Sequence, residues 1–393
     1  MIALPLLLAA TGVLPPAQLV VATPRGETHI AVVADAGGRP MVAASPLAAA
    51  LGGALRRDGA WVVVVVSRQD FAFLPHAPFY RLNDRLEPLA VAALERSDSL
   101  FVPYQFVSEI LPRYLGELYQ FDRQASRLVQ LGAVAAPAPK RLPNGLLPGH
   151  IVTVDAGHGG ADPGNPGRFF PAGVTEKDVT LKVALLLEKE LASRGITVRM
   201  TRTTDVRPNL LQRAPTCDAS CDLFVSLHVD ALDPRRRRDY RSISGFSTLI
   251  IGEENSADAE RVARTENEAL RFESEADQNL ALGPLAFILK DLQMNEYLRE
   301  SARAGALMQA NLEPIHPGVN RGVKQRNDLA VLNTGRRPGV LVEMGYSSSP
   351  SDAAFLLSSD GQRKIARALA DAIVDYLLEF EWKSGVRAVG SRP

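Results

Sequence analysis

Two histidines and a glutamate in this chain have the types and settings of metal ligands. His158 lies between glycines, where the backbone can bend and leave the imidazole open at the end of the apolar run 151–154. Glu176 precedes an apolar helical pattern, and His228 follows the apolar run 223–227. Two imidazoles and one carboxylate form the ligand set of catalytic zinc, whose fourth position is left for water. The residues therefore predict a catalytic Zn²⁺ site with His158, Glu176 and His228 as ligands.

A fourth residue adds a proton acceptor to this set. Glu343 ends the apolar run 339–342, where a carboxylate has no structural reason to be. There it could take a proton from an attacking water and return it to a leaving amine, which is metal-assisted amide hydrolysis. Each residue alone also has an ordinary reading. His228 could be a core or surface histidine, Glu176 a carboxylate favoured by a helix N-terminus, and Glu343 half of a buried ion pair.

The elements that must position these residues follow an alternating pattern. An apolar run is followed by a helical pattern several times, which predicts an α/β fold with a mostly parallel sheet flanked by helices. Because parallel strands end at one rim of the sheet, His158 and His228 can meet there. The predicted strands are 151–154, 196–200, 223–227, 246–251, 328–332 and 339–343, and the predicted helices are 179–191, 210–219, a long stretch within 255–312, and 365–380.

With these motifs in place, the chain from residue 151 to about 380 resembles the zinc-dependent N-acetylmuramoyl-L-alanine amidases of the Amidase_3 family. The matching stretches are Val154-Asp-Ala-Gly-His-Gly-Gly160, Thr175-Glu-Lys177, Thr201-Arg202, residues 222–231, Ser244-Gly-Phe246, Val331-Leu332 and Leu341-Val-Glu-Met-Gly-Tyr346. The resemblance implies that His158, Glu176 and His228 hold zinc and that Glu343 is the catalytic glutamate. It also implies cleavage of the peptidoglycan amide between N-acetylmuramic acid and L-alanine, in wall remodelling or daughter-cell separation. A zinc peptidase acting on another amide and a non-catalytic wall-binding regulator remain the alternatives.

The resemblance also bears on regulation. The segment 264–298 is longer than a minimal catalytic domain needs and contains Glu266, Glu268, Glu273, Glu275 and Asp277. Insertions of this kind in division-associated members of the family hold a helix that occludes the zinc site until an activator displaces it. We therefore expect a carboxylate here, Glu273 or Glu275, to cap the zinc at rest. The plain alternative is a solvated acidic helix. The arginine run 235–238 is likewise either a solvated face or an attractor of an anionic substrate.

The rest of the chain predicts a leader, a small domain and a linker. Residues 1–14 are apolar and Val20 and Ala22 suit a signal peptidase, so residues 1–22 predict an export signal and a periplasmic or extracellular, wall-associated protein. Residues 27–131 predict a small α/β stalk or wall-targeting domain, similar to copper amine oxidase N-terminal-like domains; an amidase-associated β-sandwich is the competing assignment. Residues 132–149 are a Pro/Ala-rich linker, and residues 150–381 form the catalytic domain.

Composition narrows the classes of partner. The 393 residues hold 44 Lys plus Arg and 44 Asp plus Glu, so bulk charge does not favour nucleic acid. We expect peptidoglycan as the substrate, with no nucleic acid and no transmembrane segment in the mature protein. Cys217 and Cys221 predict either a short disulfide or buried thiols; without a nearby histidine they make a poor zinc site.

Overall fold

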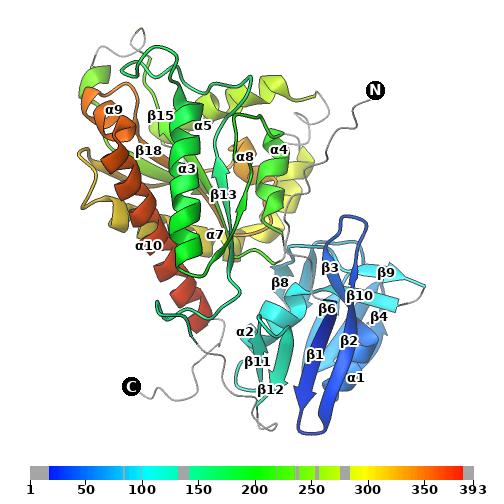
Figure 1. Ribbon diagram of the computed structural model, residues 1–393. Helices are drawn as coiled ribbons and strands as arrows, with labels where there is room; N and C mark the ends of the chain where they lie inside the picture. Colours follow the sequence, from blue (N-terminus) through cyan, green and yellow to red (C-terminus); the bar gives the residue numbers. More distant parts are fainter. Residues whose placement is uncertain are drawn as a thin grey trace, which may run out of the picture.

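The computed structural model describes two domains (Figure 1). The described residues are 17–82, 85–97, 99–131, 141–218, 220–233, 235, 239–252, 256–274 and 284–383, with side chains described from residue 297 onward in the long helix that begins at 284. The N-terminal domain, blue to cyan in Figure 1, is mainly β-structure. The second domain, green to red, is an α/β unit.

The second domain is built on a six-stranded sheet with the order β14-β13-β15-β18-β16-β17. The first four strands are mutually parallel, whereas β16 runs antiparallel to β18 and pairs in parallel with β17. This confirms the mostly parallel sheet. The strands are β13 (Ile151–Ala156), β14 (Thr197–Met200), β15 (Leu223–Asp230), β16 (Phe246–Ile251), β17 (Asn320–Arg326) and β18 (Gly339–Tyr346). The helices are α3 (Glu176–Ser193), α4 (Leu210–Arg213), α5 (Ala257–Asn267), α7 (Pro284–Leu312), α8 (Ala330–Asn333), α9 (Pro350–Leu357) and α10 (Ser359–Lys383), with short turns η2 (Ala214–Thr216), η3 (Tyr240–Ser242) and η4 (Glu268–Phe272).

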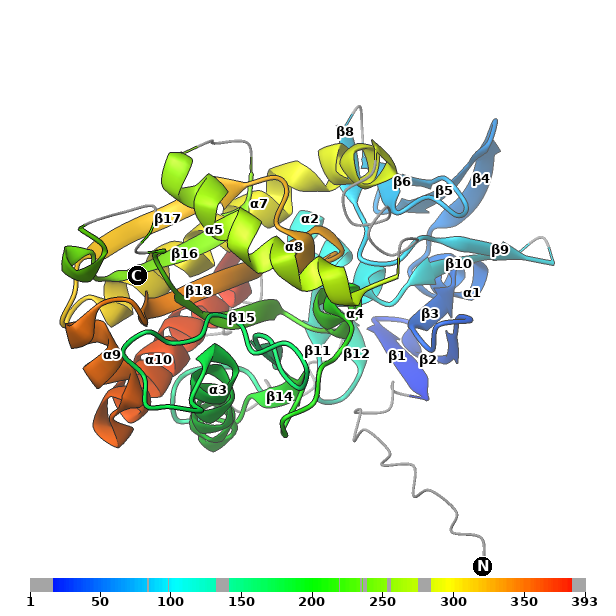
Figure 2. The ribbon, with the colours of Figure 1, turned by 90° about the horizontal axis from the view of Figure 1, so that it is seen from above.

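Alternation along the central strands separates the two faces of this sheet. Val225, Leu227 and Val229 of β15 pack in the core with α3, α7 and α10. Phe224 points the other way, into a second core with α4, α5 and α8. His228 has the same parity as Phe224, so it faces α5. Figure 2 shows α3 and α10 on one side of the sheet and α5 and α8 on the other.

One local prediction in this domain is wrong, and one strand was not predicted. Residues 328–332 were expected as a strand, but Ala330–Asn333 form the short helix α8. A short apolar run is ambiguous between strand and buried helix, and here its leucine, alanine and valine side chains fill the α4–α5 core. The strand β17 was not expected, because its sequence Asn-Arg-Gly-Val-Lys-Gln-Arg is polar and only partly buried at the sheet edge.

The N-terminal domain holds two antiparallel-rich sheets, in the orders β11-β12-β1-β2-β3-β10-β9 and β4-β5-β6-β7-β8. Its strands are β1 (Gln18–Thr23), β2 (Gly26–Ala34), β3 (Pro40–Ala43), β4 (Ala54–Asp58), β5 (Trp61–Val66), β6 (Gln69–Phe73), β7 (Phe79–Leu82), β8 (Arg85–Pro88), β9 (Leu94–Arg96), β10 (Ser99–Pro103), β11 (Tyr119–Asp122) and β12 (Arg127–Gln130). Its helices are α1 (Ala44–Ala50), the π-helical η1 (Phe106–Ile110) and α2 (Leu111–Tyr114). The domain is thus richer in strands than an even α/β mixture.

The strand β1 corrects the expected boundary of the leader. It pairs with β12 on one side and β2 on the other, and Leu19 and Val21 are completely buried in the domain core. Cleavage after Ala22 would remove a strand from within the sheet. A leader that leaves this domain intact would therefore end before Gln18. Residues 1–16 lie outside the described part of the chain.

The second half of the expected linker belongs to the catalytic domain. Leu146 is completely buried in the α3–α10 core, and the backbone N–H of Leu147 donates to Glu381 of α10, at 2.6 Å. Arg141 forms an ion pair with the same carboxylate, at 2.6 Å. The chain from 141 is therefore fastened to α10, and residues 132–140 lie outside the described part.

A buried ion pair joins the two domains. Arg337, in the turn before β18, donates two hydrogen bonds of 2.8 Å to Glu109 of η1, and both side chains are at most 3% exposed. Arg123 of the N-terminal domain pairs with Asp222 at the start of β15, at 2.7 Å. The N-terminal domain thus contacts the two segments that lead into the central strands β15 and β18.

Removing one member of the Arg337–Glu109 pair should lower the free energy of unfolding far more than removing both members. We expect Arg337→Met to lower the free energy of unfolding by about 3–5 kcal/mol, because it leaves a buried carboxylate without its bidentate partner. The double variant Glu109→Leu/Arg337→Met should recover most of that loss. Denaturant titration of the wild type, Arg337→Met and the double variant tests this; equal losses in the single and double variants would contradict it.

Two further sequence questions are answered by the structure. Cys217 and Cys221 form a disulfide, with a Cα–Cα distance of 5.0 Å. Among the described residues, no helix has the length and apolarity needed to cross a membrane.

Candidate metal centre

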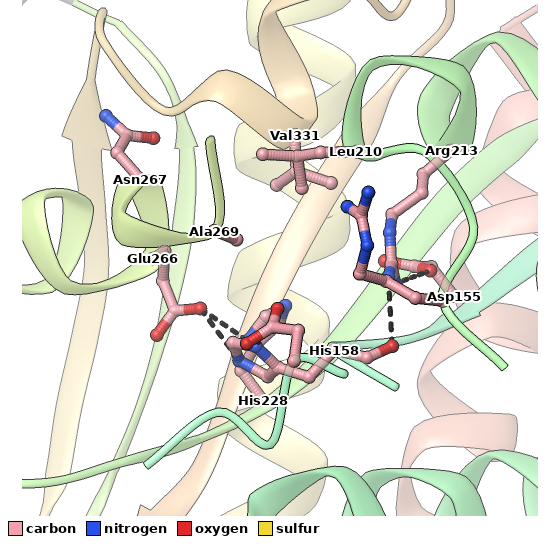
Figure 3. Close-up of a pocket in the computed structure, with 11 residues that line it drawn as sticks. Asp155, His158, Leu210, Arg213, His228, Glu266, Asn267, Ala269 and Val331 are labelled. Carbon is pink, nitrogen blue, oxygen red and sulfur yellow. Dashed lines mark hydrogen bonds and ion pairs between the residues drawn. The ribbon is translucent and has the colours of Figure 1, made fainter. Parts of the chain in front are cut away.

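Four side chains converge at the carboxyl ends of β13 and β15. The possible ligand atoms of His158, Glu176, His228 and Glu266 all lie within 4.8 Å of one another, and all four side chains are buried. His158 Nε2 and His228 Nδ1 each lie 3.2 Å from Glu176 Oε1. Glu266 Oε2 is 2.7 Å from His228 Nδ1 and 3.2 Å from His158 Nε2 (Figure 3). The three residues singled out in the sequence are thus brought together, with a fourth that was not assigned a role.

The loop after β13 holds His158 in an uncommon conformation. Its φ is +62°, in the left-handed region that non-glycine residues rarely adopt. Two arginines stabilise the turn: Arg202 donates to the carbonyls of Ala156 and Gly157, and Arg213 donates to the carbonyl of His158, at 2.8–2.9 Å. The Nδ1 of His158 lies 2.9 Å from Asp162, which places the ring proton there and leaves Nε2 facing the centre.

The N-terminus of α3 positions Glu176. Thr175 and Asp178 form a capping box, so the first turn begins at a fixed residue. Oε1 of Glu176 accepts the backbone N–H of Val229, and Oε2 accepts both the backbone and side-chain N–H of Asn165, each at 2.9 Å. Only Oε1 faces the two imidazoles. The packing is tight enough that a Cβ on Gly164 would lie 2.5 Å from Oε2.

Asn165 is therefore a positioning residue for Glu176. Its side chain also donates to the carbonyl of Val229 and accepts from the Ser347 hydroxyl, so it links α3, β15 and the end of β18. We expect Asn165→Ala to weaken metal affinity by about 10–100-fold, as is usual when the group that orients a ligand is lost. Competition with a chromogenic chelator measures the affinity. Asn144→Ala, which removes a side-chain bond to the Arg194 carbonyl far along the chain, should leave it unchanged.

His228 and Glu343 lie side by side on the sheet. They are register partners in the parallel pair β15–β18 and point to the same face. Glu343 is 1% exposed, and neither of its carboxylate oxygens has a hydrogen-bond partner. Burial raises its pKa well above the ordinary value, and the carboxylates of Asp230 and Glu266 raise that pKa further. The structure therefore provides an unengaged proton-accepting group next to the cluster.

Buried polar atoms without a hydrogen-bond partner test whether a metal ion fits among these four side chains. His158 Nε2 and Glu266 Oε2 are buried without a hydrogen-bond partner, which costs about 1–3 kcal/mol per group unless something else binds them. A tetrahedral site with bonds of about 2.0–2.1 Å has ligand–ligand edges of about 3.3 Å. Four of the separations between the inward atoms, 2.7–3.2 Å, are close to that edge, and all of them lie within 4.8 Å. Burial disfavours a charged imidazole, but the Glu266 carboxylate outweighs it and raises the pKa of His228 to about 10, so the centre attracts positive charge.

Glu266 corrects the expectation for the segment 264–298. It comes from the last turn of α5, which lies on the side of the sheet opposite α3 (Figure 2), and it reaches the two histidines of the cluster (Figure 3). Glu273 does not cap the centre; it accepts the backbone N–H of Leu210 at 2.9 Å and binds Arg207 and Asn209 at the start of α4. Glu275 lies outside the described residues. Among the carboxylates of this segment that the structure describes, Glu266 is the one that lies in the cluster.

Contacts on both sides of Glu266 hold it in place. Before it, Arg261 of α5 binds both oxygens of Asp230 at the end of β15, at 2.6 and 2.7 Å. After it, Glu273 anchors η4 to α4 as described. Sequence reasoning missed this geometry because it depends on pairings more than 30 residues apart. It also missed Asp162 and Asn165, although a polar residue four positions after a candidate ligand is a signal that could have pointed to Asp162.

These elements define a class: an α/β domain with a buried His/Glu/His cluster at the carboxyl ends of its central strands and an unpaired glutamate beside it. The family model for N-acetylmuramoyl-L-alanine amidase matches residues 152–375. The chain therefore belongs to this family, and its second domain is an amidase domain of the kind that hydrolyses peptidoglycan.

The chain is also similar to several individual proteins. The N-acetylmuramoyl-L-alanine amidase AmiC of Neisseria meningitidis serogroup B is 29% identical over 245 residues, covering 61% of this chain and 55% of its own length. AmiA of Salmonella typhimurium is 29% identical over 243 residues, covering 61% of this chain and 78% of its own. The crystal structure of an N-acetylmuramoyl-L-alanine amidase from Clostridium difficile 630 matches with a TM-score of 0.42 and 21% identity, covering 58% of this chain and 96% of that one.

Proposed function

We propose that this chain is a zinc-dependent N-acetylmuramoyl-L-alanine amidase that cleaves the peptidoglycan amide between N-acetylmuramic acid and L-alanine. The observation that carries the proposal is the convergence of four buried histidine and glutamate side chains beside Glu343. Two of their inward atoms, His158 Nε2 and Glu266 Oε2, have no hydrogen-bond partner, and neither has the carboxylate of Glu343. His158, Glu176 and His228 are assigned as the zinc ligands. When bound, zinc would supply a Lewis acid that polarises the scissile carbonyl and makes a neighbouring water more acidic.

Side chains of the protein would then transfer the protons of the reaction and orient the metal ligands. Glu343, one strand away from His228, is assigned as the catalytic residue: one of its oxygens accepts a proton from the attacking water and later returns it to the leaving nitrogen of L-alanine. Asp162 fixes the His158 ring through Nδ1, and Asn165 holds Glu176 so that a single oxygen faces the metal. These contacts prepare the ligands before any substrate arrives.

We further propose that the described conformation is a resting state. Glu266 takes the fourth position, which a catalytic site needs for water or substrate, so α5 must move before turnover. An activator protein that displaces the segment 264–298 would open the site. The wall substrate also implies that the protein is exported, to the periplasm or the cell exterior, and that the N-terminal domain serves as a targeting or stalk module.

Mass spectrometry of digested, purified peptidoglycan tests the activity. The expected products are glycan strands without peptides and intact peptides that begin at L-alanine. A chelator should abolish both products, and added zinc should restore them. Cleavage within the stem peptide would instead indicate a peptidase. If neither the full chain nor Glu266→Ala forms any product although zinc is bound, the chain is a non-catalytic wall protein.

A further inference from the structure

A cluster of arginines and aromatic rings lies beside the metal centre. Arg168 follows the loop that holds His158, and Tyr240 and Arg241 belong to η3, in the segment after β15. Arg168 Nε and Arg241 Nε both donate to the Tyr240 hydroxyl, at 3.1 and 3.0 Å. Arg241 also lies over the ring of Phe169, with 5.4 Å to the centroid. We call Arg168, Tyr240 and Arg241 the arginine clamp.

The clamp carries positive charge that nothing in the described chain balances. Among the residues that the structure describes, no carboxylate forms an ion pair with Arg168 or Arg241, and both side chains are exposed. Each guanidinium uses Nε for the tyrosine, so its terminal Nη groups remain for another acceptor. Arg241 and Arg168 lower the pKa of the Tyr240 hydroxyl, which agrees with excess positive charge at this point. Two adjacent guanidiniums are well suited to bind one carboxylate.

Backbone and side-chain contacts fix the clamp relative to the catalytic groups. The N–H of Phe169 donates to the carbonyl of Ser347, just past the end of β18, at 3.2 Å. The Ser347 hydroxyl in turn donates to Asn165, which holds Glu176. Arg168 is three residues after Asn165, so about 11 Å at most separates their Cα atoms. Tyr240 packs with Tyr346 of β18, three residues beyond Glu343.

We infer that the arginine clamp is a binding subsite for a carboxylate of the stem peptide, one or two residues beyond the scissile amide. The inference rests on the proposed amidase function and adds its peptide preference. The peptide side of the substrate is favoured over the glycan side, because free carboxylates belong to the peptide, whereas the muramic acid carboxyl is tied up in the bond to be cleaved. One or two residues of extended peptide span roughly 3–7 Å, which is within the limit of about 11 Å on the Asn165–Arg168 separation.

Direct binding tests the inference without requiring turnover. The probe is a short acidic peptide that begins with L-alanine, and its amidated analogue is the neutral comparison; calorimetry on the full chain measures both. We expect the acidic peptide to bind at least tenfold more tightly, and Arg168→Gln/Arg241→Gln to remove this preference. Arg235→Gln, which removes one exposed charge from the neighbouring loop, should keep it. Equal affinities in the wild-type chain, or a preference that survives the double substitution, would overturn the inference.

Kinetics separate this inference from the proposed function. With muramoyl-peptide substrates whose second residue carries a free or an amidated carboxyl, the ratio of kcat/KM values should favour the free acid in the wild type and approach one in the double variant. If the wild type cleaves neither substrate, the amidase proposal fails while the binding result still decides on the clamp. If it cleaves both and the ratio is the same in both chains, the clamp is wrong and the amidase proposal stands.

Discussion

Glu343→Gln is expected to lower turnover by about 10²–10⁴-fold while zinc stays bound. The amide has almost the shape of the carboxylate but cannot accept a proton, so it removes general base and general acid catalysis at once. The substitution should fold well, because Glu343 is completely enclosed and donates to and accepts from no neighbour, so no hydrogen bond is lost. Peptide release from purified peptidoglycan measures turnover, and elemental analysis of the same sample measures zinc.

A variant of an assigned zinc ligand distinguishes loss of zinc from loss of proton transfer. His158→Ala should lose zinc and activity together, whereas Glu343→Gln should lose activity alone. Both are best measured in the Glu266→Ala chain, in which the fourth position is open. Loss of zinc from Glu343→Gln would show that Glu343 is a ligand, and full activity would show that another group moves the proton.

The candidate site was predictable where short-range rules apply. His158 lies between glycines after one apolar strand, and His228 lies near the end of another. The two histidines must meet if these strands are parallel neighbours, as β13 and β15 are. Alternation within strands then puts His228 and Glu343 on one face. The start of α3 was predicted at residue 179, whereas the helix begins at Glu176, after the capping box of Thr175 and Asp178. The types of these residues and local periodicity were enough to bring them together.

The features that were not predicted from the sequence depend on long-range packing. Nothing local distinguishes Glu266 from the other acidic residues of its segment. Its position follows from Arg261 reaching Asp230, about 30 residues away, and from Glu273 reaching α4. The strand β1 looked like the end of a leader because buried strands and leader peptides are both apolar. Its partner β12 lies more than 100 residues further along the chain. The edge strand β17 carries no apolar pattern because most of its residues are only partly buried.

Glu266→Ala is expected to raise basal amidase activity by about ten- to a hundredfold. The carboxylate forms ion pairs with two imidazoles in a buried centre. We take their contribution as about 1.5–3 kcal/mol, the range for hydrogen bonds that involve a charged group. Losing that contribution shifts the balance between closed and open sites by the same free energy, which is roughly that factor in the open population. Alanine also favours helix, so α5 should persist.

Glu268→Ala is the matched control for this prediction, because Glu268 is an exposed glutamate two residues further along with the same charge. It should leave basal activity unchanged, so a rise in both variants would mean that charge, and not the contact with the centre, controls activity. Zinc content distinguishes the remaining cases. A chain that keeps zinc and gains activity has lost a resting-state ligand, whereas a chain that loses zinc and activity together would show that Glu266 is a structural ligand and that the fourth position is never vacated.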